Sequence, residues 1–156
     1  LIKFQRSIAT KKATGVDAPV GITISPQGYV TVGQMGEIND ETDSLLTFYS
    51  EAGVLLGKYK TGLHDITGLA YGPNHGRLFA LDFHWANTKE GGLYKLVDAK
   101  NDSKCTAVLM TELEKPTALA FNGDGDCYIT LAGSGDSKKS DGKLIIVRSL
   151  DIDINE

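Results

Sequence analysis

One pattern recurs three times along the 156-residue chain at a spacing of about 50 residues. The three copies read "PVGITISPQGYVTVG", "ITGLAYGPNHGRLFALD" and "PTALAFNGDGDCYITLA". Aligned, they place large apolar residues together at Ile22, Leu69 and Leu119, each preceded by a small residue at Gly21, Gly68 and Ala118. Because side chains alternate across a strand, each first strand has a bulky face and a bare face. Sheets stacked closely face to face need that alternation, since large side chains must meet small ones.

Each copy continues as two hairpins. The first hairpin turns at residues 26–28, 73–76 and 123–125, where proline, glycine, asparagine and aspartate set or permit the dihedral angles of a tight turn. A second hairpin starts about 25 residues after each copy begins, with polar turns at 51–53 and 100–103. No stretch has apolar residues at helical spacing, and 18 glycines interrupt the chain. Four strands per repeat of this length are typical of a β-propeller blade.

We therefore predict an all-β fold: a β-propeller of four-stranded antiparallel blades, with about three blades and a partial one in this chain. Residues 1–17 are predicted to be the outer hairpin of an incomplete blade. Residues 18–63 and 64–113 form two blades, and 114–156 form a third that need not be complete. A β-sandwich also has short strands at regular spacing, but it does not require the recurrence of a whole hairpin-loop-hairpin unit.

The first two stretches resemble the blade pattern of NHL-repeat proteins and of the related gluconolactonase, regucalcin and strictosidine-synthase-like six-bladed propellers. The resemblance covers about three blades. It implies that Asp82, in the place of the family's motif aspartate, organises a blade loop. In lactonase-type members an asparagine before the first inner strand helps to bind the catalytic metal, and here Thr67 and Thr117 stand in that place. The resemblance therefore implies lactonase chemistry only if the metal ligands lie in blades outside this chain.

Three blades and a partial fourth do not close a ring, since propellers close with four to eight blades. An open ring leaves two largely apolar blade faces in water. We therefore expect a partner that completes it, either a second copy of the chain in a homodimer with two-fold symmetry or the remaining blades of a longer polypeptide.

Charge and hydropathy exclude some classes of partner. The net charge is −4, which does not provide the basic surface that nucleic acid requires. No apolar run reaches the roughly 18 residues of a membrane span, so we expect a soluble protein, compatible with a secreted or periplasmic location. Cys105 and Cys127 lie in apolar strands without metal-ligand spacing, and we predict that they are packing residues.

The long loops mark the end where a site is expected. Strands alternate in direction, so the loops after the second strands open at the same end of the ring as the starts of the first strands. Those loops, 34–43, 82–91 and 132–142, are longer than the turns at the opposite end. Binding residues concentrate on long loops held by a rigid scaffold.

The densest cluster of chemically active residues falls at this end, around the expected central channel. Its predicted binding residues are Gln34, His64, Asp65, Asp82, His84 and Trp85. Carboxylates and a histidine favour a divalent metal such as calcium or zinc on Asp82, Asp65 and His64, and Trp85 offers an aromatic face for a sugar or an aromatic ligand. In the alternative interpretation the aspartates cap backbone amides, the histidines are surface residues and Trp85 packs between blades.

Three functional hypotheses follow. The first is a non-enzymatic propeller module that binds a small ligand or a protein through its long-loop end. The second is a metal-dependent hydrolase or lactonase that resembles the regucalcin and gluconolactonase group. The third is a structural repeat segment of a larger protein. The fold alone does not choose among them, because one scaffold supports many functions.

Overall fold

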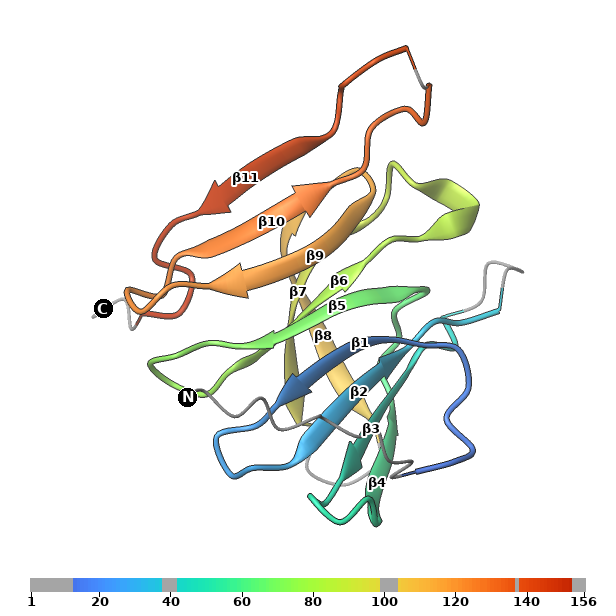
Figure 1. Ribbon diagram of the computed structural model, residues 1–156, viewed down its shortest axis with the longest axis vertical. Coiled ribbons are helices and arrows are strands. Elements are labelled where there is room, and N and C mark those ends of the chain that lie inside the picture. The colour runs from blue at the N-terminus through green and yellow to red at the C-terminus, as the bar shows by residue number, and fades with distance from the viewer. Residues whose placement is uncertain (1–12, 38–41, 99–103, 137, 153–156) are drawn as a thin grey trace, which may run out of the picture.

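The computed structural model describes residues 13–37, 42–98, 104–136 and 138–152, which form eleven β-strands and one short 3₁₀ helix (Figure 1). The first eight strands are β1 (Pro19–Ile24), β2 (Val30–Gln34), β3 (Leu45–Tyr49), β4 (Leu55–Lys60), β5 (Ile66–Tyr71), β6 (Leu78–Asp82), β7 (Gly92–Asp98) and β8 (Cys105–Glu112). The last three are β9 (Pro116–Phe121), β10 (Cys127–Leu131) and β11 (Lys143–Val147). The 3₁₀ helix η1 (Trp85–Asn87) lies between β6 and β7.

The strands form three antiparallel sheets that follow one another along the chain. Their orders are β1-β2-β3-β4, β5-β6-β7-β8 and β11-β10-β9, and we call them blade 1, blade 2 and blade 3. The inner strands β1, β5 and β9 lie side by side, as Figure 1 shows, so the sheets fan out from a common line. This arrangement is that of propeller blades, and it differs from a sandwich, in which two sheets enclose one interior.

Bulky side chains of each blade pack on bare backbone of the blade before it. A Cβ atom on Gly21 would lie 3.2 Å from Leu69 Cγ, and one on Gly68 would lie 2.8 Å from Leu119 Cδ2. On β2, a Cβ atom on Gly33 would collide with Cγ2 of Ile66. The alternation of large and small residues read from the sequence thus brings the blades close enough for contact.

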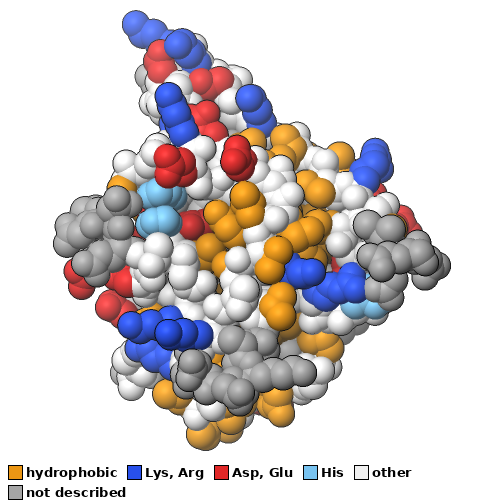
Figure 2. Space-filling view, turned by 180° about the vertical axis from the view of Figure 1, so that it is seen from behind, with side chains coloured by type: hydrophobic (Ala, Val, Ile, Leu, Met, Phe, Trp, Pro, Cys, Tyr) orange, Lys and Arg blue, Asp and Glu red, His pale blue; other side chains and the backbone are white. Residues whose placement is uncertain are grey.

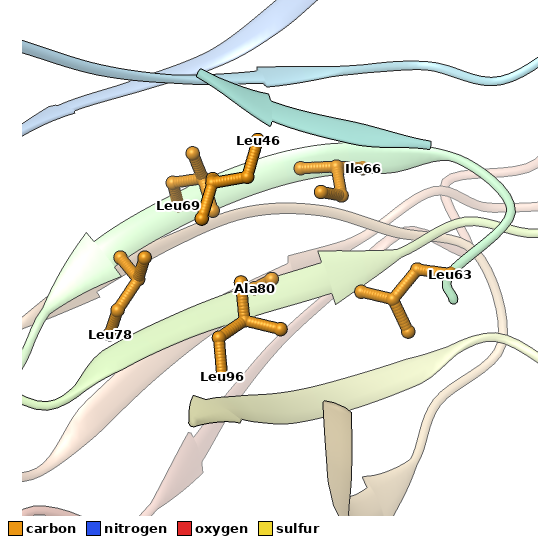
Figure 3. Packing of buried hydrophobic residues seen from close by; sticks show 7 residues of the cluster. All are labelled: Leu46, Leu63, Ile66, Leu69, Leu78, Ala80 and Leu96. Atoms are coloured by element: carbon orange, nitrogen blue, oxygen red, sulfur yellow. The ribbon is translucent and has the colours of Figure 1, made fainter. Parts of the chain in front are cut away.

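Two buried clusters fill the spaces between the blades. The first, between blades 1 and 2, contains Leu46, Leu63, Ile66, Leu69, Leu78, Ala80 and Leu96 (Figure 3). The second, between blades 2 and 3, contains Phe79, Leu81, Leu93, Leu113, Cys127 and Ile129. Burial raises the pKa of the Cys127 thiol to about 12, so it stays protonated and acts as a small apolar group.

The inner hairpins turn at the positions that the sequence predicts, and each turn contains a glycine with positive φ. Gly28, Gly76 and Gly125 take positive φ values of 85°, 62° and 83°, a conformation that favours glycine.

The all-β propeller prediction is confirmed. The predicted outer hairpin at 1–17 falls mostly outside the described residues, and 13–17 contain no strand. The blade boundaries remain predictions. Across the described ranges, the structure has no helix with the length and hydrophobicity needed to cross a bilayer.

Candidate functional site at the long-loop end

The chain between blades 1 and 2 brings the predicted cluster to the long-loop end. The amide of Gly36, just after β2, donates to the carbonyl of His64 at 2.9 Å. An isolated antiparallel bridge joins Met35 to Asp65. The start of β5 is therefore held against the loop that leaves β2, and its residues lie beside those that follow β6.

Asp82 is the centre of this cluster and is buried, with 1% of its surface exposed. Its Oδ1 accepts hydrogen bonds from the amides of Asp65 at 2.7 Å and His84 at 3.2 Å. Its Oδ2 accepts from the amide of His64 at 3.1 Å. Three amide donors stabilise the carboxylate and fix the chain that enters β5 against the end of β6.

In the other two blades, Gln34 and Leu131 stand at the position of Asp82. The backbone before the first strand also has a different conformation there. One backbone bond recurs, from the residue after the second strand to the residue before the first: Met35 to Ala18, Phe83 to Asp65 and Ala132 to Lys115. Ala18 and Lys115 have positive φ values of 34° and 52°, whereas Asp65 does not. In blade 2 the hydrogen bonds to Asp82 thus occur together with a start of the first strand that has no positive φ.

Gln34 occupies in blade 1 the position that Asp82 has in blade 2. Its side chain is buried, and Nε2 donates to the carbonyl of Asp17 at 2.6 Å. Its Oε1 is buried and has no hydrogen-bond partner in the part of the chain that the structure describes. Gln34 therefore lies at the predicted end but inside the packed start of blade 1, away from solvent.

Asp65 links Asp82 to the loop that follows β6, because its amide donates to Asp82 and its carboxylate accepts a further hydrogen bond. Its Oδ2 accepts a hydrogen bond from the amide of Trp85 at 2.7 Å, which fixes the first turn of η1. Burial raises the pKa of the Asp65 carboxyl above its ordinary value, and the charge of Asp82 acts in the same direction. The amide of Trp85 and the two neighbouring histidines oppose this rise. Asp65 is thus a structural acceptor whose ionised form is costly.

His64 and His84 stack on each other above these carboxylates. Their ring centroids are 3.6 Å apart and their planes differ by 6°. His64 Nδ1 lies 3.4 Å from Asp82 Oδ2, and His84 Nδ1 lies 4.0 Å from Glu90 Oε2. His84 has a φ of 51°, and this left-handed residue turns the chain into η1. Figure 2 shows histidine side chains bordered by acidic ones on the surface.

Trp85 is the most exposed residue of the cluster. It is 52% exposed, although its ring lies 4.4 Å from the ring of Phe83. Its amide is fixed by Asp65. A large aromatic face is therefore presented at the surface from a constrained backbone.

Two of the long loops are closed by an acidic residue two positions before the next strand. Asp43 accepts from the amide of Glu37 at 3.1 Å, and Asp141 accepts from the amide of Ser134 at 2.9 Å. In blade 2 the equivalent residue is Glu90, opposite His84. Hydrogen bonds from Ser134, first from its side chain, lower the pKa of the Asp141 carboxyl. The sequence analysis did not identify this loop closure, although Asp43, Glu90 and Asp141 recur at the spacing of the repeat.

The residues do not fit the predicted metal centre. Among the described residues, no group of three or more histidines, cysteines or acids is placed to hold a metal ion. Both Asp82 oxygens and one Asp65 oxygen already accept amide hydrogen bonds. Thr67, in the place of the lactonase asparagine, donates to the carbonyl of Pro116 at 2.8 Å and joins blades 2 and 3. We therefore assign no chemical step to a metal.

Sequence reasoning also missed two features at the short-turn end. Asp151 is fully buried and accepts from the amides of Asn74 and His75, at 2.8 and 3.1 Å, so it ties blade 2 to the end of blade 3. A cavity of about 770 Å³ lies between blades 1 and 2, and its aromatic walls come from Tyr29, Phe48, Tyr59 and Tyr71. These residues come from separate strands and turns, so no local sequence motif predicts the cavity or the buried carboxylate.

Comparison with known proteins supports the fold. No family model matches the chain, and no curated protein matches its sequence significantly. Among solved structures, a protein provisionally assigned as a gluconolactonase matches with a TM-score of 0.55 and 15% identity, over 73% of this chain and 41% of that chain. A PQQ-bound aldose sugar dehydrogenase from Streptomyces coelicolor matches with a TM-score of 0.54 and 14% identity, over 86% of this chain and 44% of that chain.

Both neighbours are β-propeller proteins, and this chain has the same fold. It spans less than half of the length of either neighbour. At these identities the likeness concerns the fold and does not carry over an activity.

Proposed function

We propose that the long-loop end of this propeller binds a sugar or a sugar-derived small molecule, with Trp85 as the stacking surface. The observation that carries the proposal is the exposed Trp85 ring on a backbone fixed by Asp65. Ligand sites combine an aromatic surface with a few positioned polar groups. His64 and His84, which stack on each other, and Glu90, 4.0 Å from His84 Nδ1, supply such groups at the same end of the propeller.

Two observations favour a sugar as the class of ligand. The flat apolar face of an indole suits the C–H face of a sugar ring, while imidazole and carboxylate groups suit its hydroxyls. The two structural neighbours are described as acting on a sugar lactone and on an aldose. Both points support the same class of compound, and neither requires a reaction.

Trp85 is the single tryptophan of the chain, so its fluorescence reports this site alone. We expect a saturable change in emission when glucose or gluconolactone is titrated into the protein. The replacement Trp85→Ala should reduce the affinity measured by calorimetry at least tenfold. Tyr29→Ala removes an exposed aromatic residue at the opposite end and should leave affinity unchanged. Absence of saturable binding by both compounds contradicts the proposal.

A metal-dependent lactonase is the second candidate, favoured by the neighbour assigned as a gluconolactonase. It is supported less well, because the described residues do not form a metal site. Acid release from gluconolactone, followed with calcium or zinc added, separates the two candidates. Turnover that disappears with chelator favours the lactonase, and binding without turnover favours the module.

A further inference from the structure

The inner strands of the two outer blades, β1 and β9, carry complementary faces that nothing in the described chain covers. On blade 1, the bulky side of β1 points away from blade 2, and Ile22 and Ile24 are 66% and 57% exposed. On blade 3, the bare side of β9 points away from blade 2, and Ala118 and Ala120 are exposed there. Tyr128 and Leu144 extend this second face as exposed apolar residues. Exposed apolar residues gathered on one face in this way mark interaction sites.

The complementarity follows from the packing inside the molecule. Leu69 of blade 2 packs on Gly21 of blade 1, and Leu119 of blade 3 packs on Gly68 of blade 2. At both internal contacts the bulky row belongs to the later blade and the bare row to the earlier one. The open faces continue the series: blade 3 offers the bare row, at Ala118, and blade 1 offers the bulky row, at Ile22.

We propose that a second copy of this chain covers both faces, with blade 1 of each copy packed on blade 3 of the other. Ile22 and Ile24 of one copy then pack against Ala118 and Ala120 of its partner, and the reverse contact forms across a two-fold axis. Each contact is head-to-tail, and two of them close the ring when three blades span half a turn. The resulting assembly is a six-bladed propeller made of two chains.

The outer edges of the two faces support this pairing. Blade 3 has three strands in its described residues, so β11 has an unpaired edge there, which strands tend to fill. Over the outer half of the exposed face of blade 1, residues 13–15 line a cavity of about 300 Å³ with Thr47 and Tyr49. The segment lies where the outermost strand of a preceding blade would lie. The two-fold pairing brings the open β11 edge of the partner toward it.

The oligomeric state of the chain and of three variants tests the proposal. Multi-angle light scattering should give about twice the chain mass of 16.7 kDa for the unchanged protein. Ile22→Asp and Ala118→Asp should each halve that mass, because both place a charge in a dry contact. Val108→Asp changes an exposed β-branched residue on the outer strand of blade 2 and should leave the dimer intact. Circular dichroism confirms that each variant is folded.

Mixing the two monomeric variants separates head-to-tail pairing from other arrangements. In a mixed dimer one contact carries both charges and the other is unchanged, so the mixture should recover dimer that neither variant forms alone. A monomeric unchanged protein overturns the proposal. An oligomer larger than two, or dissociation by Ile22→Asp without any effect of Ala118→Asp, also overturns it.

Discussion

Asp82→Ala is expected to destabilise the fold by about 3–5 kcal/mol, because it leaves three backbone amides, two of them buried, without an acceptor. The amides belong to His64, Asp65 and His84, and the carboxylate that they share is almost completely buried. Urea denaturation followed by circular dichroism measures this change in the free energy of unfolding. The substitution should also disturb the position of Trp85, whose amide depends on Asp65.

Two controls separate this role from a general effect of removing an acid. Asp82→Asn keeps Oδ1 as an acceptor and should be less destabilising than Asp82→Ala. Asp141→Ala removes an exposed carboxylate that closes a loop in the same way, and its effect should be clearly smaller. A change for Asp82→Ala as small as that for Asp141→Ala contradicts the structural role assigned to Asp82.

Asp151→Ala is expected to cost about 2–4 kcal/mol, since it removes the buried acceptor of two backbone amides and the carboxylate beside Arg77. Asp151 Oδ2 accepts from Asn74 and His75, and Arg77 Nη1 lies 3.7 Å from Oδ1. The same denaturation experiment measures the loss. Asp124→Ala, which removes an exposed acid in a nearby turn, is the control and should change stability little. Equal effects of the two substitutions contradict the role of Asp151 as a link between blades.

The local features of the fold are predictable from the sequence because local chemistry determines them. The glycines at 28, 76 and 125 predict the inner turns, and the alternation around Ile22, Leu69 and Leu119 predicts which face of each strand is bulky. Both depend on neighbours along the chain. The recurrence at about 50 residues predicts about three four-stranded blades, and the family resemblance supports their arrangement as a propeller.

The site was harder to predict because its interactions join distant segments. The sequence predicts that Asp82 lies near His64 and Asp65, but it does not show that backbone amides donate to both oxygens of Asp82. It shows Gln34 at the equivalent position without revealing its burial. Asp151 follows β11 in a segment that looks like a strand start or a frayed end, yet its carboxylate is buried against blade 2.

A double-mutant cycle between Gly33 and Ile66 tests the central claim, that bulky side chains of one blade pack on bare backbone of the previous one. Gly33→Ala should destabilise the protein by about 1–3 kcal/mol, because the added methyl group collides with the buried Ile66 side chain. In the Ile66→Ala background that cost should largely disappear, giving a coupling of at least about 1 kcal/mol. Strictly additive effects of the two substitutions would contradict the claim.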